Sequence, residues 1–254
     1  MRIRYVMSVV ALALCLQARA DIVGMWLFEE GAGDVAVDAS GRGHDGVLMD
    51  GTGWGAGAYG GAVEFDDTGF IEWEHHEDLS FDETLTFMIF ARIDAITPQE
   101  WVGMPRKENE YTFAGHSLGA TMEMTLWLNI GGGWIGQIPA GGVFPAHGYG
   151  EWHHYAVTYD GALVTLYLDG EPAGDMDVAG EVNKTDAAMR VSNSCCGGRF
   201  MEGAVDEFVM ANHAMTPAEI AEYAAVGIEG VLSVAPRDKL PTTWARVKAT
   251  RDPR

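Results

Sequence analysis

Cysteine is scarce in this chain of 254 residues, which has only three. Cys15 lies near the start, so Cys195 and Cys196 remain as an adjacent pair. A small domain held by several disulfides is therefore excluded, and a hydrophobic core must hold the fold. In an oxidising compartment the adjacent pair would form either a vicinal disulfide or two thiols in a loop.

Positive charge is also scarce. The chain has 16 Lys and Arg against 37 Asp and Glu, a formal net charge of −21. Affinity for nucleic acids comes largely from Lys and Arg that displace counterions from phosphates. The charge therefore argues against a nucleic-acid partner.

No apolar run is long enough to span a bilayer, which takes about 20 residues. The longest run, 6–16, follows Arg2 and Arg4 and precedes Ala18-Arg19-Ala20, a pattern typical of a cleaved secretory signal peptide. We therefore interpret residues 1–20 as a signal peptide cleaved before Asp21. This predicts a secreted, periplasmic or cell-surface protein without a membrane span.

Helical periodicity is weak, whereas short runs of alternating apolar and polar residues recur between Gly, Asp and Asn. The predicted strands are 22–28, 62–65, 70–74, 84–93, 123–130, 152–159, 163–168, 188–191 and 204–210. Asp160-Gly161 and Asp169-Gly170 are typical of hairpin turns. The pattern predicts an all-β, antiparallel β-sandwich.

One short C-terminal helix is expected. Thr216 and Pro217 suit the N-cap and first helical position, and Gly227 suits its end. The remaining segment 231–254 is rich in Lys and Arg, so we divide the chain into a signal peptide (1–20), a main domain (21–230) and a basic tail (231–254). The tail is either a flexible extension or a segment that docks through Leu240 and Trp244.

Five segments, in order, carry a resemblance to a known family. They are 24–33 (GMWLFEEGAG), 38–46 (DASGRGHDG), 61–72 (GAVEFDDTGFIE), 151–170 with its two Asp-Gly turns, and 203–220 with its strand and helix start. Together they resemble the laminin-G-like (LamG) domains of the concanavalin A-like lectin/glucanase superfamily. The resemblance implies a jelly-roll β-sandwich over most of the segment that follows the signal peptide.

A structural Ca²⁺ is a further implication of this resemblance. It would join the loop 38–44 to the closing strand, with side chains of Asp38 and Asp206 and carbonyls of Gly41 and His44 as ligands. Carbonyl-rich loops beside carboxylates suit a hard cation that takes six to eight oxygen ligands. Glu29 is a possible additional ligand, and in the alternative interpretation Asp38 and Asp206 are ordinary turn and strand residues.

Candidate ligand-binding residues are large aromatic and cationic side chains with small neighbours. Trp134 and Trp54 lie in glycine-rich loops, Trp101 follows a turn, and Arg106 is one of few cations. Aromatic rings supply flat apolar surfaces for sugars. Each of these side chains is otherwise an ordinary surface group.

Catalytic signatures are weak, and we predict no catalytic residue. Residues 115–119 (GHSLG) fit the G-x-S-x-G pattern of serine hydrolases, which requires a strand that leads into a helix, and no such alternation surrounds them. The E-x-D-x-x-E strand pattern of laminarinases is absent from the sequence.

The expected function is a secreted, non-catalytic module that binds extracellular carbohydrate or protein. A polysaccharide-active glycoside hydrolase and a structural cell-surface domain are the alternatives. No oligomeric state is predicted.

Overall fold

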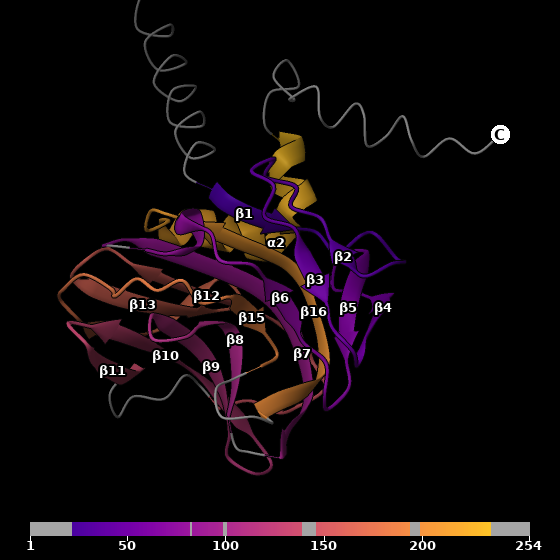
Figure 1. Cartoon of the computed structure of the whole chain (residues 1–254), viewed down its shortest axis with the longest axis horizontal. Helices are drawn as coiled ribbons and strands as arrows, with labels where there is room; N and C mark the ends of the chain where they lie inside the picture. The colour runs from indigo at the N-terminus through magenta and orange to yellow at the C-terminus, as the bar shows by residue number, and fades with distance from the viewer. Residues whose placement is uncertain (1–21, 82, 99–100, 139–145, 194–198, 235–254) are drawn as a thin grey trace, which may run out of the picture.

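The computed structural model describes residues 22–81, 83–98, 101–138, 146–193 and 199–234. Two large sheets, named here sheet A and sheet B, pack face to face and enclose the main core (Figure 1). Neighbouring strands in both sheets run antiparallel. The predicted all-β, antiparallel jelly-roll sandwich with a C-terminal helix is confirmed.

Sheet A has the strand order β14-β13-β12-β7-β16-β5-β4, and β1 also pairs with β16. Its strands are β1 (Ile22–Trp26), β4 (Thr52–Ala56), β5 (Gly61–Phe65), β7 (Leu85–Pro98), β12 (Trp152–Tyr159), β13 (Leu163–Leu168), β14 (Glu171–Asp177) and β16 (Arg199–Ala211).

Sheet B has the order β11-β10-β9-β8-β15-β6-β3-β2. Its strands are β2 (Val35–Ala36), β3 (Gly46–Leu48), β6 (Ile71–Trp73), β8 (Trp101–Lys107), β9 (Tyr111–Ser117), β10 (Met122–Ile130), β11 (Gly133–Ile138) and β15 (Met189–Val191), and a 3-10 turn η1 (Glu77–Leu79) follows β6.

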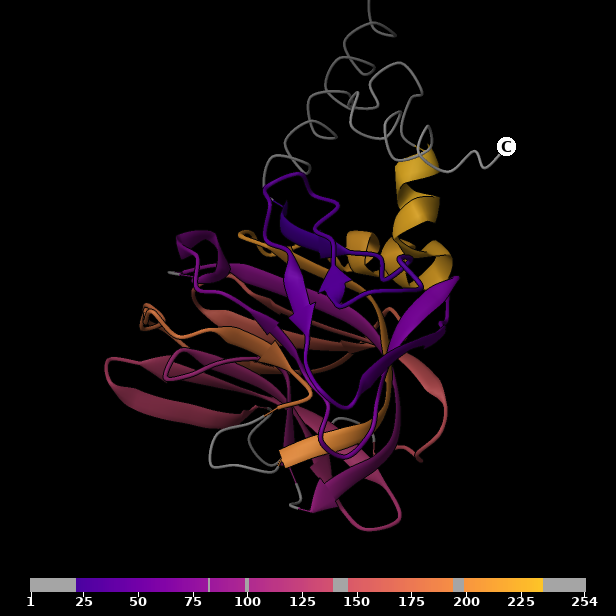
Figure 2. The ribbon, with the colours of Figure 1, turned by 45° about the vertical axis from the view of Figure 1, so that its right-hand side comes forward.

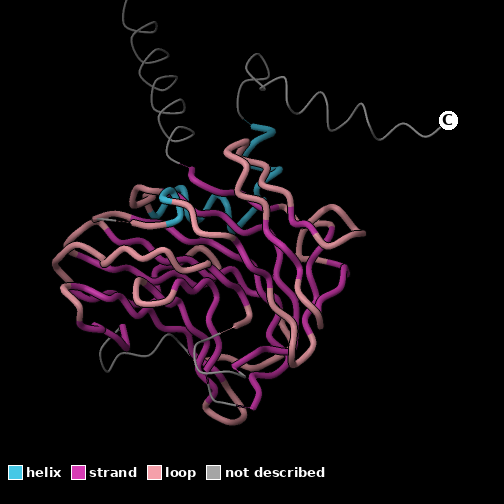
Figure 3. Tube along the Cα trace, viewed as in Figure 1, coloured by secondary structure: helices cyan, strands magenta, loops and turns pink. Residues whose placement is uncertain are grey.

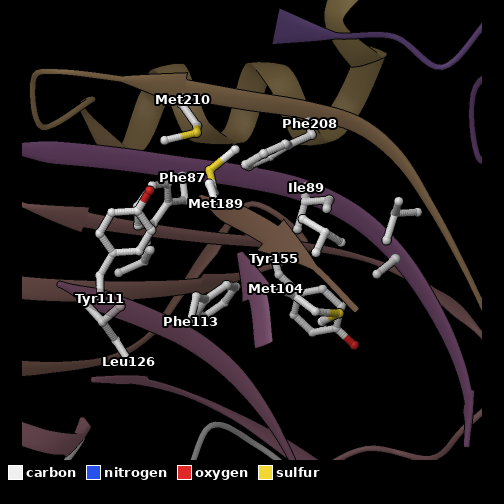
Figure 4. Packing of buried hydrophobic residues seen from close by; sticks show 14 of the residues in the cluster. Phe87, Ile89, Met104, Tyr111, Phe113, Leu126, Tyr155, Met189, Phe208 and Met210 are labelled. Carbon is white, nitrogen blue, oxygen red and sulfur yellow. The ribbon is translucent and has the colours of Figure 1, made fainter. Parts of the chain in front are cut away.

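The core lies between the sheets and is built from alternate residues of each strand. On β12, Tyr155, Val157 and Tyr159 all belong to the main cluster, as the odd-position pattern predicts. Figure 4 shows Phe87 of sheet A beside Tyr111 of sheet B, and their ring centroids are 4.9 Å apart. The apolar area buried in this core supplies the stability that disulfides provide in small secreted domains.

The two Asp-Gly pairs form the predicted hairpin turns. Asp169 (φ 53°) and Gly170 (φ 84°) join β13 to β14, and both have the positive φ that a type I′ turn requires. Between β12 and β13, the Asp160 carboxylate accepts hydrogen bonds from the backbone N–H groups of Ala162 and Leu163.

Helix α2 (Pro217–Val234) covers the outer face of sheet A. Its Ile220, Tyr223 and Ile228 pack on Met88 and Ala156 in a second apolar cluster. The backbone bends at Gly227 (φ 68°), where the sequence predicts the helix end, and continues helically to Val234 (Figure 2). Figure 3 shows this helix in cyan on one side of the magenta strands.

Four longer strands, β8, β9, β11 and β14, are not among the predicted runs. β8 carries Gly103, Pro105 and two successive cations, and β14 begins Glu-Pro, so neither shows the apolar alternation of a predictable strand. Each of the four pairs with a strand that the sequence does predict, β8 with β15, β9 and β11 with β10, and β14 with β13, and this pairing holds them in the sheets.

Three predictions concern residues that the structure does not describe. They are the signal peptide (1–20), the adjacent pair Cys195 and Cys196, and the basic tail from residue 235 to residue 254. Among the described helices, none has the length and apolar character that crossing a membrane requires.

Candidate functional site

The outer face of sheet B carries a continuous row of polar and aromatic side chains. Successive strand partners place Glu72 opposite Arg190, Arg190 opposite Arg106, Arg106 opposite Thr112, and Thr112 opposite Trp127. Directly opposed residues on neighbouring strands share one side of a sheet. Since the flanking residues Met189, Val191, Tyr111 and Phe113 belong to the core, this row faces away from the core.

A second row on the same face contains Trp101, His116 and Glu123, which are strand partners across β8, β9 and β10. We call these residues together with Trp127 the aromatic face. The Trp101 indole stacks on the His116 imidazole with ring centroids 3.9 Å apart and an interplanar angle of 12°. The His116 Nδ1 atom lies 3.0 Å from the Glu123 Oε1 atom, and Trp127 meets Trp101 edge-on at 6.1 Å. A carboxylate thus orients the imidazole, and the imidazole fixes the indole.

Ion pairs lie beside the aromatic face. The Arg190 Nε and Nη2 atoms both donate to the Glu72 Oε2 atom, at 2.7 and 2.6 Å, and the Arg190 guanidinium also lies over the Phe70 ring. Arg106 is 7% exposed and forms an ion pair with Glu108. The face therefore offers hydrogen-bond donors and acceptors of both charges next to half-buried aromatic rings.

The structure places three of the four predicted ligand residues on the outer face of sheet B. Trp101 and Arg106 belong to the rows described above, and Trp134, 41% exposed, lies opposite Asn129 on the neighbouring hairpin of sheet B. Trp54 lies instead on β4 of sheet A, where its indole N–H donates to the Gly33 carbonyl at 2.8 Å.

His116, Glu123 and Trp127 are not among the candidate residues predicted from the sequence. A signal for two of them was present, since Glu123 and Trp127 alternate with core residues in the predicted strand 123–130. The pairing of β10 with β9 and of β9 with β8, which brings these side chains to Trp101, is a tertiary feature.

The GHSLG segment lies at a turn between two antiparallel strands. Ser117 ends β9 and pairs with Met122, the first residue of β10. The Ser117 hydroxyl accepts a hydrogen bond from the Tyr149 hydroxyl at 2.8 Å. A nucleophile elbow needs a strand that leads into a helix, and this strand–turn–strand arrangement does not provide one.

Asp38 organises the loop that precedes β3. Its carboxylate accepts hydrogen bonds from the backbone N–H groups of Met25, Ser40 and His44 and from the Ser40 hydroxyl. The His44 carbonyl accepts from the Trp26 indole at 2.8 Å, and Gly41, at φ 84°, is exposed. These contacts close the loop through the protein's own donors.

Asp206 belongs to a different group, formed by the buried Asp206 and Glu207 with the half-buried Glu29, which we call the buried carboxylate group. The Asp206 Oδ2 atom accepts from the Tyr59 N–H at 2.8 Å, and the Glu29 Oε1 atom accepts from the Gly61 N–H at 2.9 Å. Among the described residues no partner bonds the buried Asp206 Oδ1 atom. A bulge in the pairing of β16 with β7 follows Asp206, and Glu207 lies in it at φ 48°, with its carboxylate against the Ile228 N–H of α2.

Burial and mutual repulsion perturb this group. Desolvation, reinforced by the charges of Glu207 and Glu29, raises the pKa of Asp206 to about 8. Desolvation, with the charges of Glu229 and Glu29, raises the pKa of Glu207 to about 7. Close carboxylates in a buried position are costly unless protons or a cation neutralise them.

Two glycines allow the chain to approach these carboxylates. A Cβ atom at Gly57 would lie 2.4 Å from the Asp206 Oδ2 atom, and one at Gly60 would lie 1.9 Å from the Glu29 Oε1 atom. The loop between β4 and β5 therefore reaches the carboxylates with its main chain.

The comparison with family models establishes the class of protein. The laminin-G-type model described as "Concanavalin A-like lectin/glucanases superfamily" matches residues 65–221, more than half of the chain. The chain belongs to this superfamily, which confirms the resemblance. No curated protein matches the sequence.

Solved structures share the fold at low sequence identity. Domain 4 of AbnA, an extracellular GH43 arabinanase from Geobacillus stearothermophilus solved with arabinotriose, is 16% identical at a TM-score of 0.64, over 80% of this chain and 98% of that one. The binding domain of Paraclostridial Mosquitocidal Protein 1 is 11% identical at a TM-score of 0.64, over 81% of this chain and 52% of that one.

A third similar structure is that of botulinum neurotoxin type C, a toxin whose cell entry depends on interaction with two ganglioside molecules. It is 10% identical at a TM-score of 0.61, over 83% of this chain and 52% of that one. The chain thus corresponds to about half of each toxin chain and to nearly all of the arabinanase domain.

Proposed function

We propose that this protein is a secreted, non-catalytic module that binds extracellular carbohydrate through the aromatic face of sheet B. The observation that carries the proposal is the stacked Trp101–His116 pair with Trp127 beside it, on the sheet opposite to the one that α2 covers.

An indole ring held in one orientation loses little entropy when it contacts a ligand. The apolar C–H face of a pyranose or furanose ring matches such a surface, while its hydroxyls need donors and acceptors at the edge. The Thr112 hydroxyl lies directly opposite Trp127 and meets that need for one sugar ring, whereas the Arg190–Glu72 pair, three strands further along the same row, would meet a longer oligosaccharide.

The comparisons support a carbohydrate ligand. One similar fold was solved in complex with arabinotriose, and another belongs to a toxin whose cell entry depends on gangliosides. At 10–16% identity these similarities show a shared fold and do not by themselves transfer a ligand. The choice of a carbohydrate ligand therefore rests also on the aromatic face.

The proposal is tested by screening the full chain against neutral and acidic polysaccharides and measuring Kd for the best ligand by calorimetry. Trp101→Ala and Trp127→Ala should each weaken binding about tenfold, or about 1.4 kcal/mol, because each removes a stacking surface. Trp54→Phe is the matched control and should bind like the wild type.

Binding that survives both substitutions, or that fails in Trp54→Phe instead, would contradict the aromatic face as the site. Release of reducing ends from the bound glycan would favour the glycoside hydrolase alternative. No binding to any glycan would favour a protein partner or the structural alternative.

We further propose a structural Ca²⁺ at the buried carboxylate group. Oxygen atoms suited to a hard cation lie in this group, since Glu29 and Asp206 offer carboxylates and the Gly61 carbonyl lies beside Gly57 together with the Asp206 Oδ2 atom. Of the four ligands predicted from the sequence, Asp206 has a buried oxygen without a partner among the described residues, whereas Asp38 accepts four hydrogen bonds. Bound Ca²⁺ would neutralise the carboxylates.

Thermal and urea unfolding in Ca²⁺ and in chelator test this site. Ca²⁺ at one hundred times its Kd should add about 2.7 kcal/mol to the free energy of unfolding. Asp206→Asn should abolish this increment, and in chelator it should unfold no more easily than the wild type, because it removes a buried charge.

Asp38→Asn distinguishes a Ca²⁺ site at the buried carboxylate group from one in the loop 38–44. It should lower stability equally in Ca²⁺ and in chelator, because it weakens the turn and leaves the increment intact. If Asp38→Asn abolishes the increment and Asp206→Asn keeps it, the ion lies in the loop 38–44 instead. Unchanged wild-type stability in chelator would contradict the Ca²⁺ site altogether.

Export is the remaining part of the proposal. Expression of the full chain in a secreting host should yield a protein that begins at Asp21 in the periplasm or medium. N-terminal sequencing measures this, and an intact residue 1 on cell-retained protein would contradict it.

A further inference from the structure

Three side chains with metal-binding atoms meet at the edge of the sandwich. None of them belongs to the buried carboxylate group, and two of them offer nitrogen rather than oxygen as a ligand. His44 precedes β3, His76 caps the 3-10 turn η1, and Asp78 lies within that turn. One ligand atom of each lies within 4.8 Å of the others. The His44 Nε2 atom is 3.3 Å from the Asp78 Oδ2 atom, and the two imidazole centroids are 4.3 Å apart.

We propose that His44, His76 and Asp78, named here the His–Asp cluster, bind a divalent transition metal of the Zn²⁺ type. Imidazole nitrogen is a preferred ligand for Zn²⁺ and a poor one for Ca²⁺ and Mg²⁺, which prefer oxygen. The cluster would therefore select a different metal from the all-oxygen group at Asp206.

The distances suit this ion. With bonds of about 2.0–2.1 Å, neighbouring ligands of a tetrahedral Zn²⁺ lie about 3.3 Å apart. The His44 Nε2 and Asp78 Oδ2 atoms are already 3.3 Å apart, and the ligand atoms of all three side chains lie within 4.8 Å of one another. Three protein ligands leave a fourth position for water, as in zinc sites that exchange ligands.

The main chain already holds the two histidines in place. The backbone N–H of His44 donates to Asp38 and its carbonyl accepts from Trp26, while the His76 Nδ1 atom accepts from the Asp78 N–H. His44 is buried, and the side chains of Asp78 and His76 are 35% and 53% exposed, so a metal can reach the cluster from solvent.

Both positively and negatively charged side chains surround the His–Asp cluster. The Arg42 guanidinium donates to the Asp78 Oδ2 atom at 3.1 Å, so the metal shares this carboxylate with an arginine. A polar hollow next to the cluster is lined by Asp78 and by three further carboxylates, Glu77, Glu83 and Glu181, with Lys184 as a cation among them. The excess of carboxylates attracts a dication to this edge.

The experiment titrates Zn²⁺ into the full chain by calorimetry, in buffer saturated with Ca²⁺ so that the oxygen site is filled. One equivalent should bind with a Kd of about 10 µM or tighter. His76→Asn keeps an acceptor that can cap η1 and Asp78→Asn keeps the side-chain shape, so both should fold like the wild type. Each should bind at least about tenfold more weakly, since losing even an outer partner of a ligand costs 10–100-fold.

Two controls address other histidines. His75→Asn removes the adjacent imidazole, which faces Asp186, and His153→Asn removes one ring of the His147–His153 pair, whose centroids are 4.5 Å apart. Both should bind Zn²⁺ like the wild type. In a complementary NMR titration of the wild type, the ring signals of His44 and His76 should shift with one equivalent of Zn²⁺ and those of His75 should not.

Three results would each overturn the proposal. They are the absence of stoichiometric Zn²⁺ binding by the wild type, Zn²⁺ binding by His76→Asn and Asp78→Asn as tight as that of the wild type, and loss of Zn²⁺ binding in His153→Asn instead. If a variant fails to fold, the NMR titration of the wild type decides, because unshifted His44 and His76 signals exclude the site.

Discussion

At the scale of single residues, the fold buries ionisable groups on both of its sheets. Lys107 and Glu110 are both fully buried at the end of β8, where the Lys107 ammonium contacts Glu110, the Ser80 hydroxyl and the Thr185 carbonyl. Their opposite charges compensate each other inside the protein. His154 is also buried, and among the described residues nothing bonds its Nδ1 atom.

His154 makes stability depend on pH. Desolvation lowers its pKa from 6.5 to about 4 in the folded chain. As the pH falls, the unfolded chain binds the proton first, so the contribution of His154 is complete above about pH 6.5 and is lost towards pH 4. Between pH 7.5 and 5 the loss amounts to roughly 2 kcal/mol.

Urea unfolding of the wild type and of His154→Asn over this range measures the effect. The difference in free energy of unfolding between the two proteins should shrink by that amount as the pH falls, which removes the contribution of every other titrating group. A difference that does not change with pH, or an NMR titration midpoint of the His154 ring above 6, would contradict this.

At the scale of elements, one helix decides which sheet face is available. Apolar residues of α2 cover the outer face of sheet A, so Met88, Ala156 and Val209 are buried on that side too. The outer face of sheet B carries the aromatic face. The same helix also contacts the buried carboxylate group, since the Ile228 N–H donates to the Glu207 Oε2 atom at 2.6 Å.

Ile220 is the test of this packing, because it is fully buried between α2 and sheet A. Ile220→Ala should lower the free energy of unfolding by about 3 kcal/mol through lost burial and the cavity left behind. Val226→Ala on the same helix is the control, since Val226 is 42% exposed and should change stability by less than about 0.5 kcal/mol. Equal effects of the two substitutions in urea unfolding would show that α2 is not held by this face.

At the scale of the whole molecule, the net charge of −21 opposes folding into a compact shape. The screening length falls from about 30 Å at 0.01 M salt to about 8 Å at 0.15 M, so added salt weakens repulsion between distant carboxylates. Removal of residues 1–20 with their three arginines would take the charge to −24.

We therefore expect the melting temperature in chelator to rise by about 3 °C between 0.01 M and 0.15 M NaCl, which corresponds to about 1 kcal/mol for a chain of this size. KCl should act like NaCl, because screening depends on ionic strength. A fall in melting temperature would contradict the repulsion argument, and a rise with only one of the two salts would indicate specific ion binding.

The amino-acid sequence by itself determined the class of fold. Alternation places Tyr155, Val157 and Tyr159 on one side of β12, and Asp169-Gly170 has the conformational freedom of a tight hairpin turn. These are local properties, because a side chain's position along a strand and a backbone's φ preference depend on near neighbours. The order of such segments also carried the family resemblance.

Only the tertiary structure decided what the side chains do together. Trp101, His116 and Trp127 come from three strands and meet through cross-strand register, which no local pattern encodes. Asp38 and Asp206 look alike in the sequence, yet the loop around Asp38 satisfies its carboxylate while the bulge in β16 buries Asp206 with an oxygen unbonded by the described residues. Burial and partners are properties of packing, and packing joins residues that are far apart in the chain.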